Sequence, residues 1–212
     1  MQDALAQGGI YVITDARLIA GEQLLTAVAA ALRGGAALVQ YRDKGDRIKE
    51  RSRRRREATA LLALCHEQQV PLIINDDIEL AAAIAADGVH LGREDASPAL
   101  ARQRLGHDAI IGISGYADPR AALTVEADYI AFGRLFESYT KPQASPASLH
   151  TLRTARTLTH KPIVGIGGIN RHNAAQVAAA GANWLAVVNA VFDSQDIEAS
   201  TRALCSALNQ QI

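Results

Sequence analysis

A chain of 212 residues that carries 22 Lys and Arg against 22 Asp and Glu has no formal net charge. This balance leaves no overall field to hold nucleic acid or an anionic membrane, so any anion-binding site must be local. Apolar residues make up 49% of the chain and aromatic residues only 4%, which predicts an aliphatic, alanine-rich core of helices packed on a sheet.

Cysteine usage and the first residues bear on the compartment. Cys65 and Cys205 lie in apolar, helix-like segments at no metal-binding spacing, so we expect two small buried thiols in a reducing environment. The first nine residues have no charged leader or apolar segment, and no apolar run approaches the ~20 residues of a membrane span. We therefore expect a cytoplasmic location and no membrane partner.

Eight short apolar segments recur along the chain, separated by helix-like stretches. They are continuous rather than alternating, as in parallel strands covered by helices. The predicted strands are 9–15, 37–44, 71–77, 88–92, 109–115, 129–133, 162–168 and 184–191. This pattern predicts an α/β protein, a (β/α)8 TIM barrel with a parallel eight-stranded sheet in one domain over 1–212. The alternative, an open doubly wound sheet, is less favoured because polar residues follow almost every strand.

Two segments between the strands stand out. The basic run "DRIKERSRRRREA" at 46–58 is interpreted as the solvated face of the second helix rather than a nucleic-acid site. The segment 134–148, after strand six, is the longest irregular piece, and a loop of this length in a compact domain is more often functional than idle.

Gln40, Arg42 and Lys44 alternate at the end of the second strand, so their side chains leave it on one face. If this face lines the barrel, two unpaired cations would be costly to bury without a bound anion. A planar guanidinium and a compact ammonium together suit a phosphate or pyrophosphate. The alternative is that the face looks outward or that carboxylates neutralise the cations.

Acidic residues follow the next two strands. Asp76 ends strand three and Asp95 follows strand four, so both belong to the same part of the barrel mouth. Two carboxylates beside an anion site predict Mg²⁺ shared with the phosphates. The competing interpretation gives them helix-start roles, although Asp77 is the better N-cap because the helical pattern begins directly after it.

Later in the chain the signals are weaker. The glycines of "GIGGIN", 165–170, close strand seven and predict a second anion site, since the loops after strands seven and eight often bind phosphate in barrels. Lys141, on the long loop, either closes over the mouth or is simply solvated. His90 is interpreted as a hydrogen-bonded structural residue rather than a catalytic base.

Eight segments, in this order, resemble the thiamine-phosphate synthase (thiamine-phosphate pyrophosphorylase) family over essentially the whole chain. They are "YVIT" (11–14), "QYRDK" (40–44), "INDD" (74–77), "DGVHLGRED" (87–95), "IGIS" (111–114), "FGRLFESYTKP" (132–142), "GIGGI" (165–169) and "VVNA" (187–190).

The resemblance implies a transferase that couples 4-amino-2-methyl-5-(diphosphooxymethyl)pyrimidine with 4-methyl-5-(2-phosphoethyl)thiazole. The products would be thiamine phosphate and pyrophosphate, formed by a dissociative substitution assisted by Mg²⁺. The thiazole nitrogen has a lone pair and no proton, so no general base is required. Small-molecule substrates are then the expected partners, and the sequence leaves open whether the chain forms a homo-oligomer.

The resemblance also implies site residues by position. The pyrimidine-diphosphate contacts would be Gln40, Tyr41, Arg42, Asp43, Lys44, Asn75 and Ser114, with Asp76 and Asp95 as Mg²⁺ ligands. The thiazole-phosphate contacts would be Ser138, Tyr139, Thr140, Lys141, Gly168, Val188 and Asn189. Arg42, Lys44, Lys141 and Ser114 would act in catalysis on the departing pyrophosphate. Ser138 and Asn189 depart from the usual threonine and serine of the family.

Two other functions fit the same scaffold. A thiazole tautomerase tends to have a histidine just after strand five, where this chain reads "SGYAD". A non-catalytic binder of thiazole phosphate would be expected to lose a metal ligand or a diphosphate cation. Retention of Arg42, Lys44, Asp76, Asp95 and Lys141 favours the synthase over both.

Overall fold

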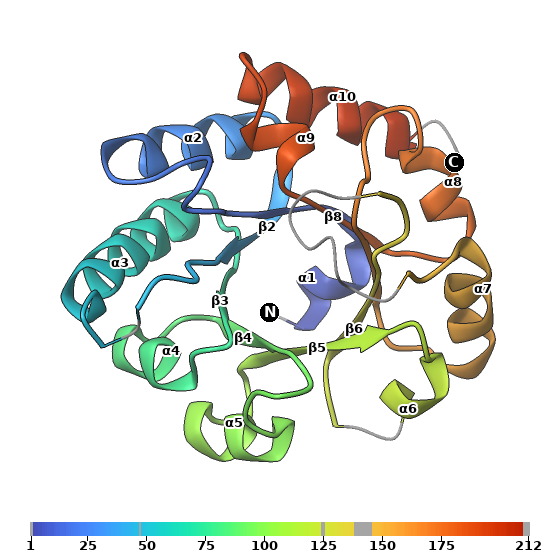
Figure 1. Ribbon diagram of the computed structural model, residues 1–212, viewed down its shortest axis with the longest axis horizontal. Coiled ribbons are helices and arrows are strands. Elements are labelled where there is room, and N and C mark those ends of the chain that lie inside the picture. The colour runs from blue at the N-terminus through green and yellow to red at the C-terminus, as the bar shows by residue number, and fades with distance from the viewer. Residues whose placement is uncertain (1, 47, 124–125, 138–145, 210–212) are drawn as a thin grey trace.

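The computed structural model describes residues 2–46, 48–123, 126–137 and 146–209, and its eight strands form a closed parallel barrel in the order β1 to β8. Figure 1 shows the strands as a ring, with the amino-terminal helix across the ring and the other helices outside it. The strands are β1 Gly9–Ile13, β2 Ala36–Tyr41, β3 Leu72–Asn75, β4 Gly88–Leu91, β5 Ile110–Tyr116, β6 Tyr129–Phe132, β7 Ile163–Ile166 and β8 Trp184–Val187. Because β8 pairs in parallel with β1, the predicted TIM barrel is confirmed and the open sheet is wrong.

Helices connect the strands, and some of them begin at a side-chain N-cap. They are α1 Gln2–Gln7, α2 Glu22–Arg33, α3 Arg51–Glu67, α4 Ile78–Ile84, α5 Pro98–Leu105, α6 Pro119–Leu123, α7 Leu149–Leu158, α8 Ala174–Ala179, α9 Asn189–Phe192 and α10 Ile197–Asn209. The Asp77 side chain accepts from the N–H of Leu80, which confirms it as the N-cap of α4. Over the ranges given above, no helix is long and apolar enough to cross a membrane.

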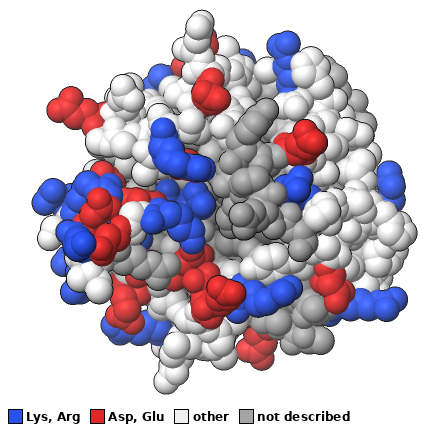
Figure 2. Space-filling view, viewed as in Figure 1, with Lys and Arg blue, Asp and Glu red and all other residues white. Residues whose placement is uncertain are grey.

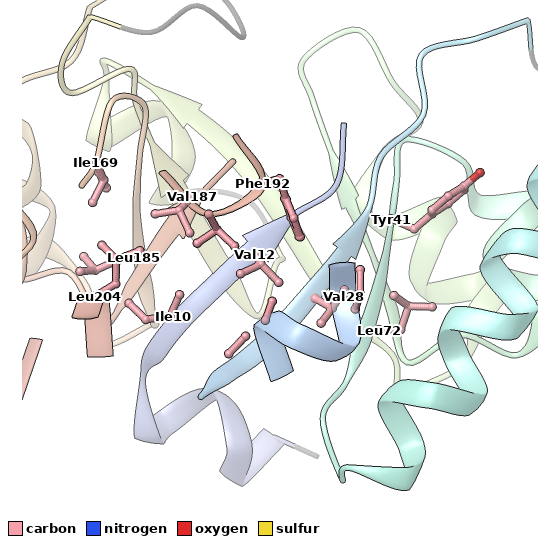
Figure 3. Packing of buried hydrophobic residues seen from close by; sticks show 14 of the residues in the cluster. Ile10, Val12, Val28, Tyr41, Leu72, Ile169, Leu185, Val187, Phe192 and Leu204 are labelled. Carbon is pink, nitrogen blue, oxygen red and sulfur yellow. The ribbon is translucent and has the colours of Figure 1, made fainter. Parts of the chain in front are cut away.

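Apolar side chains pack in two layers, one on each side of the barrel wall. In the outer layer, Ile10 and Val12 of β1 lie with Val28 of α2 and Leu204 of α10, as Figure 3 shows. The inner layer fills the barrel with residues of alternate parity such as Tyr11, and it includes Leu5 of α1. The Trp184 indole donates to the Leu5 carbonyl at 2.9 Å, so α1 closes the amino-terminal end of the barrel and leaves only the opposite end open.

The basic run of α3 does not lie wholly in solvent. Arg54 is 3% exposed and its Nη1 lies 2.8 Å from Oδ2 of Asp77, at the start of α4. Arg53 is half-buried and pairs with Asp43, Glu50 and Glu57. The prediction of a solvated face is therefore wrong for these two arginines. Figure 2 shows basic and acidic side chains interspersed over this side of the molecule, so the run makes no basic patch of one sign.

Candidate functional site

A cavity of about 410 Å³ opens at the carboxyl ends of the strands. Its lining includes residues from β1 to β8, as expected for the active face of a barrel. Seven predicted site residues lie in this lining: Gln40, Arg42, Asn75, Ser114, Gly168, Val188 and Asn189. The geometry therefore brings residues from both predicted subsites to one cavity.

Arg42 is held at the cavity by Asp15, which follows β1. Its Nη1 lies 3.1 Å from Oδ2 of Asp15, and the two side chains are 11% and 4% exposed. Burial acts to raise the pKa of Asp15, but hydrogen bonds from Arg17 and the charge of Arg42 lower it overall. Nε of Arg42 is buried and finds no hydrogen-bond acceptor in the described part of the chain. A buried N–H without a partner is costly, so this guanidinium is suited to bind an anion by donating a hydrogen bond to it.

Lys44 reaches the rim of the barrel at β3. Its ammonium forms an ion pair with the buried carboxylate of Asp76, while the Lys44 side chain remains 52% exposed. The two predicted cations are thus partly neutralised by carboxylates, which was the alternative interpretation of the alternating pattern. Neutralisation is incomplete for Arg42, because Asp15 also pairs with Arg17.

Asp76 adopts a backbone conformation with φ of 60°, which a residue with a Cβ atom rarely takes. Its N–H donates to the His90 carbonyl at 2.8 Å, and the Asn75 amide donates to its Oδ2 at 2.6 Å. Such conformations cost about 1–3 kcal/mol and are concentrated at functional sites. These contacts fix the direction in which the Asp76 carboxylate points.

Asp95 meets Asp76 at this rim. The Asp95 carboxylate accepts from the N–H of Gly92 at 2.8 Å and shares a hydrogen bond with Asp76. Burial and the hydrogen bond to Asp76 raise the pKa of Asp95. Burial would also raise the pKa of Asp76, but Lys44 and Asp95 lower it overall. Two carboxylates this close require either a shared proton or a cation.

These two carboxylates fit a magnesium ion that takes few protein ligands. Mg²⁺ usually binds one or two carboxylates and completes its shell with water and substrate phosphates. Among the residues that the structure describes, no group of three or more His, Cys, Asp or Glu could hold a metal. An all-protein metal cage is thus not seen there, and a shared site is the kind that Asp76 and Asp95 suit.

Tyr41 and Asp43 do not face the cavity, although the resemblance placed them among the substrate contacts. The Tyr41 hydroxyl donates to Glu57 of α3 at 2.7 Å, and Arg53 Nη2 donates to the Asp43 carboxylate at 2.5 Å. Side chains alternate across a strand, so residues between the inward positions 40, 42 and 44 must point at the helix. The two side chains therefore face α3, and the assignment of Tyr41 and Asp43 as substrate contacts stays a prediction that their backbone atoms would have to meet.

The loop after β7 is packed against the segment that follows β6. Leu135 N donates to the Ile166 carbonyl at 2.9 Å, and Phe136 N donates to that of Gly167 at 3.1 Å. Gly168 has φ of 67°, and a Cβ there would lie 2.4 Å from the Glu137 carbonyl oxygen. Only glycine fits this approach. Ser138, Tyr139, Thr140 and Lys141 lie outside the described residues, so a phosphate site here stays a prediction.

His90 is hydrogen-bonded at both ring nitrogens, as predicted for a structural residue. Nδ1 lies 3.0 Å from the Tyr129 hydroxyl and Nε2 lies 3.1 Å from Oγ of Ser114. The imidazole also stacks on the Tyr129 ring at a centroid distance of 5.6 Å. His90 therefore connects the cavity wall to the inner core.

Sequence reasoning missed several residues at or beside this cavity, among them Tyr11, Asp15 and Tyr116. Tyr11 lines the cavity on β1, and its inward position was readable from the parity it shares with Ile13. Asp15 was also readable, because a polar residue directly after a barrel strand lies at the active face. Tyr116 also lines the cavity. Its φ is 56°, it lies next to an irregularity in the pairing of β5 with β6, and no pattern in the sequence predicts its place in the cavity wall.

Comparisons with known proteins identify the same family by sequence and by structure. Residues 10–191 match the family described as thiamine monophosphate synthase. A thiamine-phosphate synthase from Nitrosococcus oceani is 52% identical over 198 residues, which cover 92% of this chain and 90% of the relative. One from Halorhodospira halophila is 48% identical over 199 residues and covers 92% of each chain.

Solved structures show the same likeness. The thiamine phosphate pyrophosphorylase from Pyrococcus furiosus superposes with a TM-score of 0.86 at 32% identity, covering 97% of this chain and 98% of that one. A 3-hexulose-6-phosphate synthase superposes with a TM-score of 0.67 at 13% identity, which shows a shared fold alone.

Proposed function

The chain belongs to the thiamine monophosphate synthase family, and we propose that it is a transferase that makes thiamine phosphate and pyrophosphate. Its substrates would be 4-amino-2-methyl-5-(diphosphooxymethyl)pyrimidine and 4-methyl-5-(2-phosphoethyl)thiazole. The observation that carries the proposal is the meeting of Arg42, Lys44 and the Asp76–Asp95 pair at one side of the cavity mouth. These groups form a charged rim that suits a diphosphate.

In the proposed reaction, the bond between the exocyclic methylene carbon and the diphosphate oxygen breaks first. Its electron pair leaves with pyrophosphate, and the electron-rich aminopyrimidine stabilises the methylene cation. The lone pair of the thiazole nitrogen then forms the new carbon–nitrogen bond. No proton has to be removed from the nucleophile. This agrees with the state of His90, whose two ring nitrogens are both hydrogen-bonded within the protein.

The protein's contribution is fixed positive charge and exclusion of water. The Arg42 guanidinium, with its free Nε–H, and the Lys44 ammonium would stabilise charge on the departing oxygens, a preorganised effect worth about 10²–10³ in rate per donor. Apolar residues such as Ile13, Val164 and Ile166 line the rest of the cavity and would keep water from trapping the cation. Asp76 and Asp95 would hold Mg²⁺, which when bound neutralises charge on pyrophosphate.

A thiazole tautomerase is disfavoured by the residues beyond Ser114 on β5. That strand continues with Gly115 and Tyr116, whose ring lines the cavity, and no histidine follows them there. A non-catalytic binder would not need the charged rim, which is present in the described residues Arg42, Lys44, Asp76 and Asp95.

The test is an assay of the purified chain with both substrates and Mg²⁺. We expect release of one pyrophosphate for each thiamine phosphate formed, and no turnover when either substrate is omitted. Isomerisation of a thiazole without pyrophosphate release would favour the tautomerase. Tight binding of thiazole phosphate with no product would favour the binder.

A further inference from the structure

A continuous line of hydrogen bonds crosses the floor of the cavity beneath the charged rim. It runs from β2 through β1, β6 and β4 to β5, so it spans the barrel rather than following one strand. The heavy-atom distances are 2.6 Å from Gln40 Nε2 to the Tyr11 hydroxyl, 2.9 Å from Tyr11 to the Tyr129 hydroxyl, 3.0 Å from Tyr129 to His90 Nδ1 and 3.1 Å from His90 Nε2 to Ser114 Oγ. Its two ends, Gln40 and Ser114, are both candidate substrate contacts.

The middle of this line is rigid and dry. Tyr11 is 1% exposed and Tyr129 is fully buried, and their rings pack edge to face at 6.0 Å. Burial raises the pKa of both phenols, so each hydroxyl keeps its proton and has one hydrogen to donate. A buried hydroxyl that cannot place its hydrogen loses about 1–3 kcal/mol, so the donors and acceptors along the line must agree with one another.

Counting hydrogens gives the line a single direction. The amide nitrogen of Gln40 can only donate, so the Tyr11 hydroxyl accepts from it. The other hydrogen-bond partner of the Tyr11 hydroxyl is the Tyr129 hydroxyl, to which Tyr11 therefore donates. Tyr129 then donates to Nδ1 of His90, and the ring proton of His90 must lie on Nε2.

This direction determines which hydrogen-bonding group each end of the line offers to a ligand. Nε2 of His90 donates to Ser114 Oγ, so the serine hydroxyl keeps its own hydrogen for another acceptor. The Gln40 amide donates one of its two N–H groups to Tyr11, which fixes the side of the residue on which its carbonyl oxygen lies and leaves that oxygen as an acceptor for a ligand. Within the described ranges neither Gln40 nor Ser114 makes a further side-chain hydrogen bond, and both line the cavity.

We propose that Tyr11, Tyr129 and His90 are positioning residues that fix the hydrogen-bond polarity of the cavity floor. The Gln40 end presents an acceptor and the Ser114 end presents a donor. The line acts as one unit, because turning the Gln40 amide would reverse every hydrogen bond as far as Ser114. The ligand that fits carries an N–H donor at one end and an anionic oxygen acceptor at the other.

Resting on the proposed function, this assigns the two ends of the pyrimidine substrate. The ring amino group would donate to Gln40 Oε1, and Ser114 would donate to the diphosphate or to the oxygen that leaves with it. In a substrate bound the other way round, the amino group would face the Ser114 hydroxyl, which is also a donor, and the diphosphate would face Gln40 Oε1, which is also an acceptor. The line would therefore also select the orientation in which the methylene faces the thiazole.

The direct test is ¹⁵N NMR of the histidine rings in the ligand-free chain, with His90→Gln used to assign its signals among the six histidines. We expect Nε2 of His90 to be protonated and Nδ1 to be a bare acceptor. The Tyr129→Phe variant removes the donor to Nδ1, so its His90 signals should shift toward a mixture of the two tautomers. A proton on Nδ1 in the unmodified chain, or an unchanged pattern in Tyr129→Phe, would overturn the proposal.

Tyr41→Phe is the matched control, because it removes the hydroxyl of another buried tyrosine on the opposite face of β2. We expect its His90 signals to match those of the unmodified chain. If Tyr41→Phe disturbs the signals as much as Tyr129→Phe does, general loosening of the barrel explains both and the proposal fails.

Kinetics separate the two ends of the line. In Tyr129→Phe, the Ser114 hydroxyl is no longer committed to donating its hydrogen to the ligand. We therefore expect kcat to fall by about 10-fold, with KM changed by less than about 3-fold. Tyr11→Phe breaks the line next to Gln40, so it frees the Gln40 amide and also removes the donor that commits Tyr129 to His90. KM for the pyrimidine should then rise by about 10-fold, and kcat should fall about as much as in Tyr129→Phe. Equal effects of both variants on both constants would contradict the assignment of ends. Absence of turnover in the unmodified chain would refute the proposed function, while the NMR test of the line would still stand.

Discussion

Asp15 lies between two arginines that are exposed to very different degrees. Its Oδ2 is 2.7 Å from Nη2 of Arg17, whose side chain is 66% exposed, and 3.1 Å from Nη1 of Arg42, whose side chain is 11% exposed. The same carboxylate thus makes a surface ion pair and a nearly buried one. The buried pair holds Arg42 at the cavity with its Nε–H unsatisfied, whereas the exposed pair is screened by water.

This difference gives a prediction with a built-in control. Arg42→Ala should slow product formation by at least about 10²-fold, because it removes a preorganised donor from the departing pyrophosphate. Arg17→Ala removes the other arginine of the same carboxylate and should stay within about 2-fold of the unmodified chain. Single-turnover measurement of pyrophosphate release checks both variants. Similar losses in the two would mean that Asp15, rather than Arg42, determines the rate.

Asp95→Ala tests the proposed magnesium site. Removing one of two carboxylate ligands should weaken the apparent affinity for Mg²⁺ by at least about 10-fold, with turnover lost at ordinary Mg²⁺ concentrations. The fold should survive, because Asp95 sits on a loop after β4 and its loss relieves a close pair of carboxyl groups. The measurement is initial rate against Mg²⁺ concentration, with circular dichroism as the check on folding.

Asp108→Ala is the control for Asp95, since the Asp108 side chain is 98% exposed and precedes the amino-terminal end of β5, whereas the site lies at the carboxyl ends of the strands. Its Mg²⁺ dependence should match that of the unmodified chain. An Asp95→Ala variant with the same Mg²⁺ dependence as this control would remove Asp95 from the metal site.

The barrel and part of the site were readable from local sequence patterns. Continuous apolar runs predict strands covered on both faces, and the parity of Gln40, Arg42 and Lys44 predicts that one side of β2 carries polar groups. The same parity places the side chains of Tyr41 and Asp43 on the opposite face, and these two residues were named because the family motif is contiguous. A contiguous motif records which positions matter without saying which face of a strand each residue occupies.

Other features depend on residues that are distant in sequence. The hydrogen bond between Tyr11 and Tyr129 joins residues 118 positions apart, so no local pattern contains it. In α3, arginines occupy four consecutive positions, 53–56, so the sequence gives no stripe that tells the buried Arg54 from its exposed neighbours Arg55 and Arg56. Its burial follows from Asp77, which the barrel places opposite it.

Arg54→Met should destabilise the fold strongly. The change leaves Asp77 without its buried partner, and breaking a buried ion pair from one side costs about 3–5 kcal/mol. Arg55→Met, an exposed neighbour in the same helix, should change the free energy of unfolding by less than about 0.5 kcal/mol. Urea denaturation measures both values.

A second substitution shows whether the lost charge pair is the cause. Asp77→Asn keeps an N-cap side chain for α4 but removes the negative charge. Adding it to Arg54→Met should recover part of the lost stability, because no buried charge is then left unpaired. Simple addition of the two single effects would show that Arg54 contributes through packing instead.

Asp43 should make the fold sensitive to acid. Burial alone would raise its pKa, but the N–H of Gly45 and the guanidinium of Arg53 lower it below the ordinary value of 3.8. A carboxyl group with a depressed folded-state pKa contributes stability that is fully present above the unfolded pKa and is lost as the pH falls through the folded one. Asp43→Asn should therefore lower the free energy of unfolding near neutral pH by about 1–3 kcal/mol and flatten its decline below about pH 4. Urea denaturation between pH 2.5 and 7 checks this, with Asp108→Asn at an exposed position as control. If the free energy of unfolding falls equally steeply at acid pH in Asp43→Asn and in the unmodified chain, the assigned role of the Asp43–Arg53 pair is contradicted.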